Sequence, residues 1–544
     1  MLNYVWLALI FIGIAVAITL DVVDQSNNKY MNGQKLSVQV AFTQPVNKNE
    51  NKSYDVIVNS SKSKFNSFYK VKTEEDISQN AKINFDANKK EQFILVKIDE
   101  QSPAIWKEMS KTSGKGESLS GSIKLGRQID SLHYSGSLIL ENISFKRMKD
   151  VTNSVLSYAS TAVEIALGLI GIMALWLGVM KVAEEAGLIK IIAKAVQPIT
   201  KFLFPEIPND HPAVGAMIMN ISANMLGLSN AATPFGLKAM EELDKLNPEK
   251  GTATNAMCTF LAINTAGLTL LPVTAIAIRA AAGSANPAII IGTSVFGATC
   301  ATIAGLTAAK ILEKIPANRS GIIPWLKSYQ KNFISFIGIV LALIFLNYIG
   351  AINWVFSKLS FINADLFKGV INIVSVLAIP ALIFAFINYG AYKKVKVYES
   401  FIEGAKEGFN VAIRIIPYLV AMLAAIGIFR AGGGMDFLVM ILKPFTELIG
   451  MPAEALPMAI MRPLSGSGSL GVMAEAIAVH GADSFIGVLT STFFGSSETT
   501  FYVLAVYFGS VNIRKTRHAL PVGLIADIAG VLGAVFIVRM LFGV

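Results

Sequence analysis

The sequence predicts an all-α polytopic membrane protein built from two inverted repeats, with a small β domain inserted after the first span. The first observation is composition: the 544 residues are 53% hydrophobic, with a mean hydropathy of +0.54. Several apolar runs exceed the roughly 18 residues that cross a bilayer. The second is the polar stretch 22–150, which is rich in Lys, Asn and Ser. The third is a pair of interruptions, at residues 219–236 and 461–471, where Asn, Ser and Gly break otherwise apolar stretches.

The net charge of +10 does not indicate a nucleic-acid-binding protein, because the lysines are spread over loops and the polar insert and form no basic helix. Cys258 and Cys300 both fall in apolar stretches and suggest no disulfide framework. The four histidines lack ligand spacing. We therefore expect no nucleic acid, metal or cofactor as a partner.

The first element is an apolar segment over residues 4–20, followed by Asp21 and Asp24. A cleaved signal peptide would carry a basic n-region and a small-residue cleavage site, and neither is evident. We interpret residues 1–21 as an uncleaved first span.

Residues 22–150 are expected to form the β domain. Leu36, Val38, Val40 and Phe42 alternate with mostly polar residues. Related patterns follow at residues 54–58, 93–98, 121–125 and 137–145. Period-two alternation between turn residues is typical of β-strands. No catalytic motif occurs in this stretch, so we interpret it as an accessory domain.

From residue 151 the chain is expected to be helical, with a first repeat over residues 151–314. Its elements are a span near 155–180, an amphipathic interfacial helix over 187–205, the first interruption, and spans near 253–281 and 286–312. The span near 253–281 contains Asn264, Thr265, Gly267 and Pro272.

A second repeat over residues 391–544 shows the same order of features. It comprises a span near 410–429, an amphipathic segment at 435–448, the second interruption, a span that carries FFGSSETTFY, and a final span near 518–541. Pro198 and Pro444 occupy equivalent places, as do Pro212 and Pro457. Residues 315–390 connect the repeats through two spans, near 332–350 and 369–390.

The distribution of Lys and Arg predicts the orientation of these spans. Basic residues place both ends of the connector in the cytoplasm: Lys314, Arg319, Lys327, Lys331, Lys393, Lys394 and Lys396. If each interruption is the tip of a re-entrant hairpin, the first hairpin opens to the inside and the second to the outside. Residues 22–150 then lie outside, and the two repeats are inverted in a bacterial inner membrane.

The two interruptions are expected to meet inside the protein, because an unpaired backbone group facing lipid is strongly unfavourable. Paired interruptions in two halves are the best sequence pointer to a transporter binding site. We predict that both hairpins and both broken spans line one site. Its candidate substrate-binding residues are Asn220, Asn224, Ser229, Asn230, Thr233, Asn264, Thr265, Ser465, Ser467, Ser469, Ser496, Ser497, Glu498 and Thr499.

Glu498 and Arg462 are the ionisable residues of this predicted site, and charged side chains inside spans are usually functional. Two interpretations remain open. Glu498 is a proton or cation site, or it forms a structural salt bridge with Arg462. For the serines, close helix packing is the alternative role.

Several stretches resemble a known family. EIALGLIGIMALWLGVMKVAEEAGL, MNISANMLGLSNAATPFGLKAMEEL and TNAMCTFLAINTAG resemble spore maturation protein A, and MRPLSGSGSLG, GSSETTFYVLAVYFGSV and RKTRHALPVGLIAD resemble spore maturation protein B. The resemblance covers residues 151–314 and 390–544, as in a fusion of the two. The family is grouped with nucleoside-recognition or gate domains, which implies a transport-like fold of two gate-like repeats. The insert departs from the family pattern and suggests an extracytoplasmic partner.

Two functions are compatible with these features. The first is a transporter or permease for a small polar solute, driven by an ion gradient or by the solute's own gradient, because the chain has no P-loop run. The second is a non-transporting scaffold for envelope assembly that uses the β domain. No HExxH or GxSxG run supports an enzyme. We expect the lipid bilayer, a polar solute and a coupling ion as partners, with an envelope protein and self-association as further candidates.

Overall fold

The fold is described from a computed structural model, which covers residues 2–46, 51–86, 89, 91–208, 210–313 and 364–543. The chain divides into two compact units. The barrel unit comprises Leu7–Ser157 and Gly427–Phe437, and the helical unit comprises Met1–Trp6, Tyr158–Ile426 and Leu438–Val544. The span expected near 332–350 lies outside the described residues.

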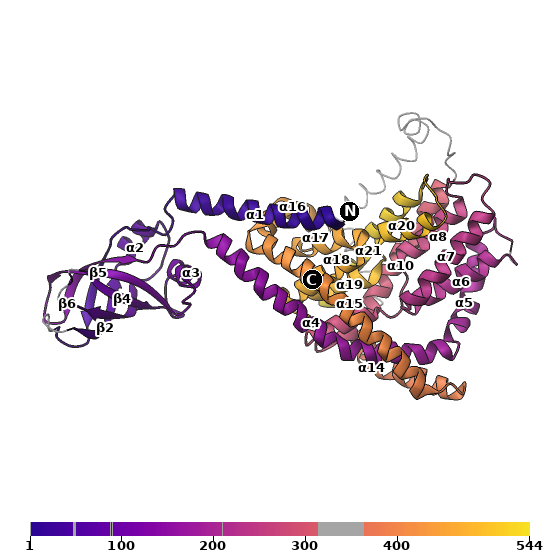
Figure 1. Ribbon diagram of the computed structural model, residues 1–544, viewed down its shortest axis with the longest axis horizontal. Helices are drawn as coiled ribbons and strands as arrows, with labels where there is room; N and C mark the ends of the chain where they lie inside the picture. Colours follow the sequence, from indigo (N-terminus) through magenta and orange to yellow (C-terminus); the bar gives the residue numbers. More distant parts are fainter. Residues whose placement is uncertain are drawn as a thin grey trace, which may run out of the picture. The chain divides into compact units, whose positions relative to one another are not determined.

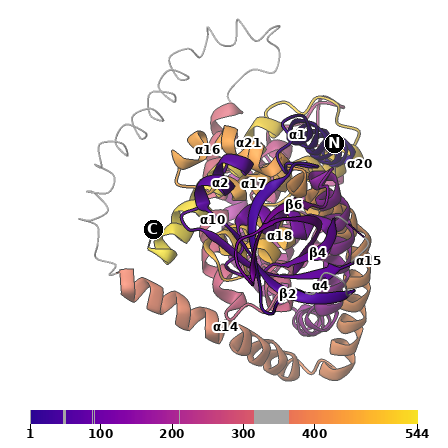
Figure 2. The same cartoon turned by 90° about the vertical axis from the view of Figure 1, so that its left-hand side faces the viewer.

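The barrel unit contains a closed antiparallel β-barrel, which confirms the predicted β domain. The described strands pair in chain order, and the last pairs back onto the first. Figure 1 and Figure 2 show the strands of this barrel. They are β1 (Leu36–Phe42), β2 (Lys52–Ser60), β3 (Ile77–Phe85), β4 (Gln92–Lys97), β5 (Ser118–Gln128) and β6 (His133–Leu140). Because the barrel is closed, each described strand has a partner on both sides, which removes the exposed edges that favour aggregation.

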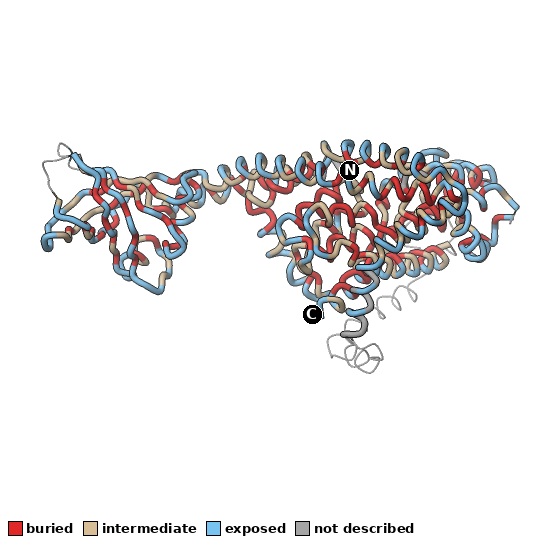
Figure 3. Tube along the Cα trace, turned by 90° about the horizontal axis from the view of Figure 1, so that it is seen from below, coloured by how far each residue is buried: buried red, intermediate tan, exposed pale blue. Residues whose placement is uncertain are grey.

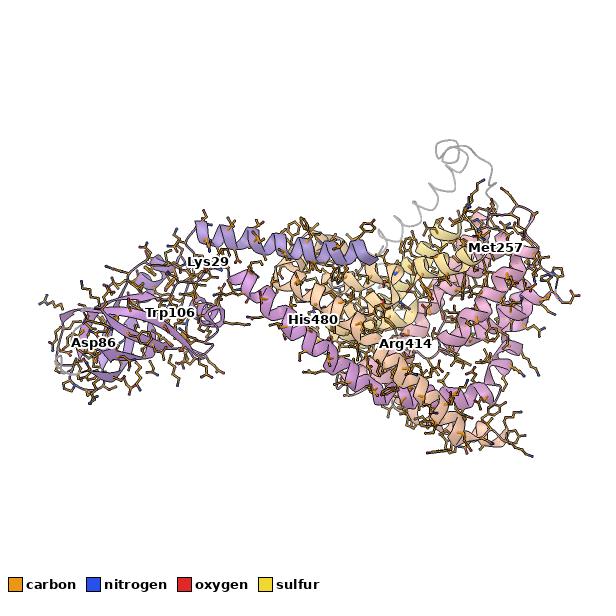
Figure 4. The ribbon with its side chains drawn as sticks, viewed as in Figure 1. Lys29, Asp86, Trp106, Met257, Arg414 and His480 are labelled. Atoms are coloured by element: carbon orange, nitrogen blue, oxygen red, sulfur yellow. The ribbon has the colours of Figure 1, made fainter. Side chains whose placement is uncertain are left out.

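Alternating apolar and polar side chains build the barrel. β1 buries Leu36, Val38, Val40 and Phe42 and turns the residues between them outward, as the two-residue period of a strand requires. Two short helices, α2 (Lys62–Tyr69) and α3 (Ala104–Ser113), add buried aromatic side chains. The indole N–H of Trp106 (Figure 4) donates to the Tyr69 hydroxyl at 3.1 Å. Neither these helices nor strand β3 was predicted from the sequence.

Asp21 ties together the two chain segments that enter and leave the barrel. These are α1 (Leu2–Ser26) and the start of α4 (Lys146–Glu185). The buried Asp21 carboxylate accepts the backbone amides of Arg147 at 2.8 Å and Met148 at 3.0 Å. A carboxylate at a helix N-terminus satisfies amides that have no intrahelical partner and interacts favourably with the helix dipole.

Glu108 of α3 forms a hydrogen bond and ion pairs with residues near the start of the barrel unit and the start of α4. It accepts a hydrogen bond from the Tyr30 hydroxyl at 2.7 Å, and it pairs with Lys29 at 3.0 Å and Lys146 at 3.6 Å. Burial raises the pKa of Glu108, but the hydrogen bonds from Tyr30 and Lys29 and the charges of Lys29 and Lys146 outweigh it. The pKa of Glu108 therefore lies below its ordinary value.

The helical unit is a bundle of long and broken helices (Figure 1). After α4 these are α5 (Leu188–Leu203), α6 (Pro212–Met225), α7 (Ser229–Lys245), α8 (Asn255–Ala266), α9 (Val273–Ala281), α10 (Ile290–Leu312), α14 (Ala364–Tyr392), α15 (Val397–Ala431), α16 (Gly434–Glu447), α17 (Leu456–Leu464), α18 (Gly466–His480), α19 (Phe485–Ser496), α20 (Thr500–Ser510) and α21 (Ala519–Phe542). Buried residues lie on the helix sides that face one another (Figure 3).

Several of these helices can cross a bilayer, so the chain is a multi-pass membrane protein. Among the described residues, the helices of sufficient length and hydropathy are Trp6–Ser26, Lys146–Glu185, Pro287–Leu312, Val397–Ala431 and Ala519–Phe542. The span expected near 369–390 corresponds to α14, whose described apolar part is Val376–Tyr392. The broken helices α8, α9, α19 and α20 are individually too short to cross the roughly 30 Å hydrocarbon layer.

Helices α10 and α21 pack closely because small residues face each other. A Cβ on Gly297 would lie 3.3 Å from the carbonyl oxygen of Gly530, and a Cβ on Gly305 would lie 3.1 Å from the Cβ of Ala526. Small residues let helix backbones approach in a membrane. Helices α8 and α19 both pack against this central pair, which fixes the positions of the two broken spans.

Candidate functional site

Helix breaks in the described part of the helical unit form the candidate site. They separate α6 from α7 at residues 226–228, α8 from α9 at 267–272, α17 from α18 at 465, and α19 from α20 at 497–499. Two of the breaks belong to the interrupted stretches of the sequence, and the other two belong to the helices that follow them.

Residue types at these positions explain why the helices break. Gly227 and Gly267 have φ angles of +76° and +55°, in the left-handed region that glycine adopts without steric penalty. Pro272, which lacks a backbone N–H, immediately precedes α9. Ser465 is extended, and its hydroxyl accepts the amide of Gly468 at 3.0 Å. That contact caps α18 at its N-terminus.

Backbone hydrogen bonds join the breaks to one another. The Leu270 amide donates to the Met225 carbonyl at 2.8 Å, which links the α8–α9 break to the end of α6. The Glu498 amide donates to the Thr265 carbonyl at 2.8 Å, which links the two broken spans. These backbone groups, freed from helices, are therefore satisfied inside the protein, as backbone at membrane depth requires.

The breaks surround a cavity of about 270 Å³. Asn224 and Thr269 line it from the first half of the helical unit, and Ser467, Ser497 and Glu498 line it from the second. The first turns of α9 and α18 also form part of its wall. Amides in the first turn of a helix have no intrahelical acceptor, and the helix dipole makes this end partly positive.

Arg462 of α17 is buried beside the cavity. Its Nη2 donates to the Ser497 carbonyl, its Nη1 lies 3.4 Å from the Thr499 hydroxyl, and the guanidinium lies 4.5 Å from the centre of the Phe494 ring. Its Nη2 is also 3.7 Å from the carboxylate of Glu498. The Glu498 side chain is 39% exposed and lines the cavity, so it is accessible to a ligand there.

A hydrogen-bond network of Asn side chains and the Tyr507 hydroxyl supports the cavity wall that the first half of the helical unit provides. Asn224 donates to the Oδ1 of Asn264 at 3.0 Å, and the Tyr507 hydroxyl donates to the same oxygen at 3.3 Å. Asn220 donates to the Tyr507 hydroxyl at 3.1 Å and to the Ala232 carbonyl at 2.7 Å. The network fixes the orientation of Asn224, which lines the cavity.

The predicted site residues whose side chains the structure describes divide into three groups. Those that line the cavity are Asn224, Ser467, Ser497, Glu498 and Arg462. Those that contact a lining residue from behind are Asn264, Thr265 and Thr499. Those that lie in helix packing or caps are Asn220, Ser465, Ser469 and Ser496, all buried, and Thr233, half-buried on α7. The side chains of Ser229 and Asn230 lie outside the described part of the chain.

The structure adds residues that the sequence analysis missed. Thr269 and Phe494 line the cavity. Asp527 on α21 is buried, and its Oδ2 accepts a hydrogen bond from the Thr500 hydroxyl at 2.6 Å. A carboxylate in the middle of an apolar span is itself a functional signal, so Asp527 could have been singled out. Thr269 and Phe494 carry no comparable signal, because threonine and aromatic residues are common in spans.

Comparison with known families gives two matched segments. The Gate family model, described as nucleoside recognition, matches residues 166–282 and 412–514. The cavity-lining residues named above fall within these segments.

Two curated proteins of Bacillus subtilis (strain 168) are similar to different parts of the chain. Spore maturation protein B is 52% identical over 174 residues, which cover 32% of this chain and 98% of that protein. Spore maturation protein A is 46% identical over 148 residues, which cover 27% of this chain and 76% of that protein. The matches are consistent with a fusion of the two. No solved structure matches the chain.

Proposed function

The chain belongs to the family of spore maturation proteins A and B, and on this premise we propose that it transports a small polar solute through the cavity between its two halves. The observation that carries the proposal is the convergence of the helix breaks on one polar cavity, whose named lining residues come from both segments matched by the nucleoside-recognition model. Broken helices are tolerated at membrane depth where they line a cavity. Secondary transporters bind their substrates at such breaks.

The cavity favours a solute with both hydrogen-bond donors and acceptors. Glu498 accepts from hydroxyl or amino groups. The Ser467 hydroxyl and the first-turn amides of α9 and α18 that are not bonded to Leu271, Pro272 or Ser465 donate to acceptors. The cavity volume of about 270 Å³ is near the lower end of small-molecule pockets, about 300 Å³. Nucleosides offer sugar hydroxyls and base edges that fit these groups, and the description of the family model agrees. The solute undergoes no chemical conversion in this proposal.

We further propose that the two halves are inverted repeats, and reciprocal contacts support this. Helix α10 packs on α19 as α21 packs on α8. Arg279, at the end of α9, donates to Ala482 in the loop after α18. In return, the loop after α20 pairs with the loop after α7, where the Ala253 amide donates to the Lys515 carbonyl at 3.0 Å. A two-fold relation makes contacts reciprocal in this way.

We also propose that the protein lies in the bacterial inner membrane with the barrel on the extracytoplasmic side. Basic residues flank the connector, and cytoplasmic loops carry an excess of Lys and Arg. An exterior barrel could present the solute or contact an envelope protein. A scaffold without transport is the alternative function, and it predicts no solute flux.

Uptake by the purified protein in liposomes tests the transport proposal. Labelled nucleosides, amino acids and cell-wall fragments are offered in turn, and we expect uptake of at least one class. Asn224→Ala should lower the apparent affinity about tenfold, the equivalent of one hydrogen bond, and Glu498→Gln should abolish uptake. Thr302→Ala on α10 is the matched control, because the Thr302 hydroxyl bonds only the Ala298 carbonyl of its own helix among the described groups. Absence of flux for every solute with correctly folded protein would overturn the proposal and favour the scaffold.

A further inference from the structure

Asp527 carries a buried carboxyl group that does not line the cavity. It lies on α21 and is 5% exposed. The Thr500 hydroxyl is 2.6 Å from its Oδ2, and Oδ1 has no hydrogen-bond partner among the described residues. An ionised carboxylate has two oxygens that each need donors, and a buried unpaired oxygen is strongly unfavourable. A protonated Asp527 can instead donate its O–H to the Thr500 oxygen.

Arg462 connects Asp527 to the cavity. Its Nη2 lies 3.7 Å from the Glu498 carboxylate, and its Nη1 lies 3.4 Å from the hydroxyl of Thr499, the residue before the Thr500 that bonds Asp527. The positive charge of Arg462 therefore acts on both carboxylates. Among the described charged side chains on elements packed against α21, Arg462 is the one that interacts with Asp527. The other described titratable side chains on these elements are Cys258 on α8, Cys300 and Lys310 on α10, Tyr502 and Tyr507 on α20, and Tyr389 and Tyr392 on α14. Asp365 and Lys368 on α14 lie outside the described side chains.

We propose that Asp527 is a proton-binding site that couples a proton to the movement of the solute, an inference that rests on the transport function proposed above. When Asp527 is protonated, Arg462 interacts chiefly with Glu498. When Asp527 releases its proton to water, its carboxylate competes for the guanidinium, and Glu498 becomes a stronger acceptor for the donor groups of the solute. The O–H bond of Asp527 is the only bond made or broken, and the proton is exchanged with water.

The arrangement of one cation and two carboxylates makes the coupling reciprocal. A proton on Asp527 changes how strongly Glu498 binds the solute, so the bound solute changes proton affinity by the same factor. Glu498 lines the cavity, whereas Asp527 is buried and does not line it. The two carboxylates can therefore take different ligands, the solute and the proton.

Infrared spectroscopy of the full-length protein in liposomes tests the proton site without any solute. At neutral pH, the wild-type spectrum should contain a protonated carboxyl C=O band that is absent from Asp527→Asn. Asp436→Asn, at an exposed carboxylate of α16, is the matched control and should retain the band. If Asp527→Asn does not fold, the spectrum of Thr500→Val is recorded instead. Loss of the hydroxyl that bonds Asp527 must then shift the protonated carboxyl C=O band. An identical band in wild type and in every folded variant of Asp527 and Thr500 would overturn the proposal.

Solute accumulation tests the coupling. With one proton per solute, a gradient of one pH unit supports accumulation of up to about tenfold. Asp527→Asn should equilibrate the solute across the liposome without accumulation and should retain exchange of labelled for unlabelled solute. Gradient-driven accumulation by Asp527→Asn would contradict the coupling role. If wild-type protein moves no solute at all, the transport function fails, while the infrared result still decides whether Asp527 binds a proton.

Discussion

The backbone of Gly267 lies directly against Glu498. A Cβ added to Gly267 would be 2.9 Å from both the amide nitrogen and the Cγ of Glu498. The same approach allows the Glu498 amide to donate to the Thr265 carbonyl. A glycine on one broken span therefore sets the position of the cavity carboxylate on the other.

Gly267→Ala should displace Glu498 and weaken the solute site. The substitution has two effects. An L-residue at the left-handed φ of +55° costs about 1–2 kcal/mol, and the added Cβ clashes with Glu498. Gly283→Ala is the matched control, because Gly283 has a φ of +76° and no atom within 4 Å of its added Cβ. We expect Gly283→Ala to lose thermal stability through the φ cost alone and to keep its solute affinity, and Gly267→Ala to lose more stability and also solute affinity. Equal affinities in liposome uptake would show that this contact does not position Glu498.

Glu498→Gln and Arg462→Gln should separate the two interpretations of this ion pair. The Glu498 side chain is 39% exposed and 3.7 Å from Arg462, so the pair adds about 0–1 kcal/mol to stability. Arg462 also bonds the Ser497 carbonyl and stacks on Phe494, contacts that together contribute about 3 kcal/mol. In thermal unfolding in detergent, Arg462→Gln should be clearly destabilised and Glu498→Gln nearly unchanged. A large, equal loss in both would favour a structural salt bridge.

Some of this site could be predicted from sequence, because polar runs such as Ser465 to Ser469 stand out in an apolar segment. Which serine faces the cavity could not be predicted: Ser465 caps a helix, Ser469 bonds back to Gly466, and Ser467 lines the wall. Those roles depend on where the helix breaks. In the barrel, strand β1 was visible from its alternation. Strand β3 was missed because it buries Gln79, a polar residue that weakens the alternating pattern.

Thiol labelling tests the proposed orientation of the barrel. Ser63 and Ser131 are exposed, so single cysteines there should react with an impermeant maleimide in intact cells once any outer membrane is permeabilised. Lys394→Cys, in the exposed turn after α14, is the cytoplasmic control and should react only after lysis. The native thiols are Cys258, which is buried, and Cys300, which is half-buried. Protection of both barrel positions until lysis would reverse the topology.

The contacts of Glu108 should make the barrel unit sensitive to acid. Because the folded pKa of Glu108 is lowered, its contribution to stability is complete above the unfolded value of about 4.3 and is lost as the pH falls through the folded pKa. Hydrogen exchange of the α3 amides, corrected for intrinsic rates, should therefore accelerate in this acidic window. Glu108→Gln should remove that part of the pH dependence. An unchanged pH profile in Glu108→Gln would exclude this residue as the cause.

Arg279 should stabilise the helical unit mainly through loop carbonyls rather than through its ion pair. Its guanidinium is fully buried and donates to Ala482, to Ser284 at 3.1 Å and to Pro287 at 3.3 Å, whereas its partner Asp483 has a side chain that is 47% exposed. Arg279→Lys keeps the charge but cannot reproduce the planar fork, and each buried acceptor left unpaired costs about 1–3 kcal/mol. Asp483→Asn removes only a half-exposed charge, worth about 0–1 kcal/mol. We therefore expect Arg279→Lys to lower the unfolding temperature far more than Asp483→Asn, and equal losses would assign the stabilisation to the ion pair.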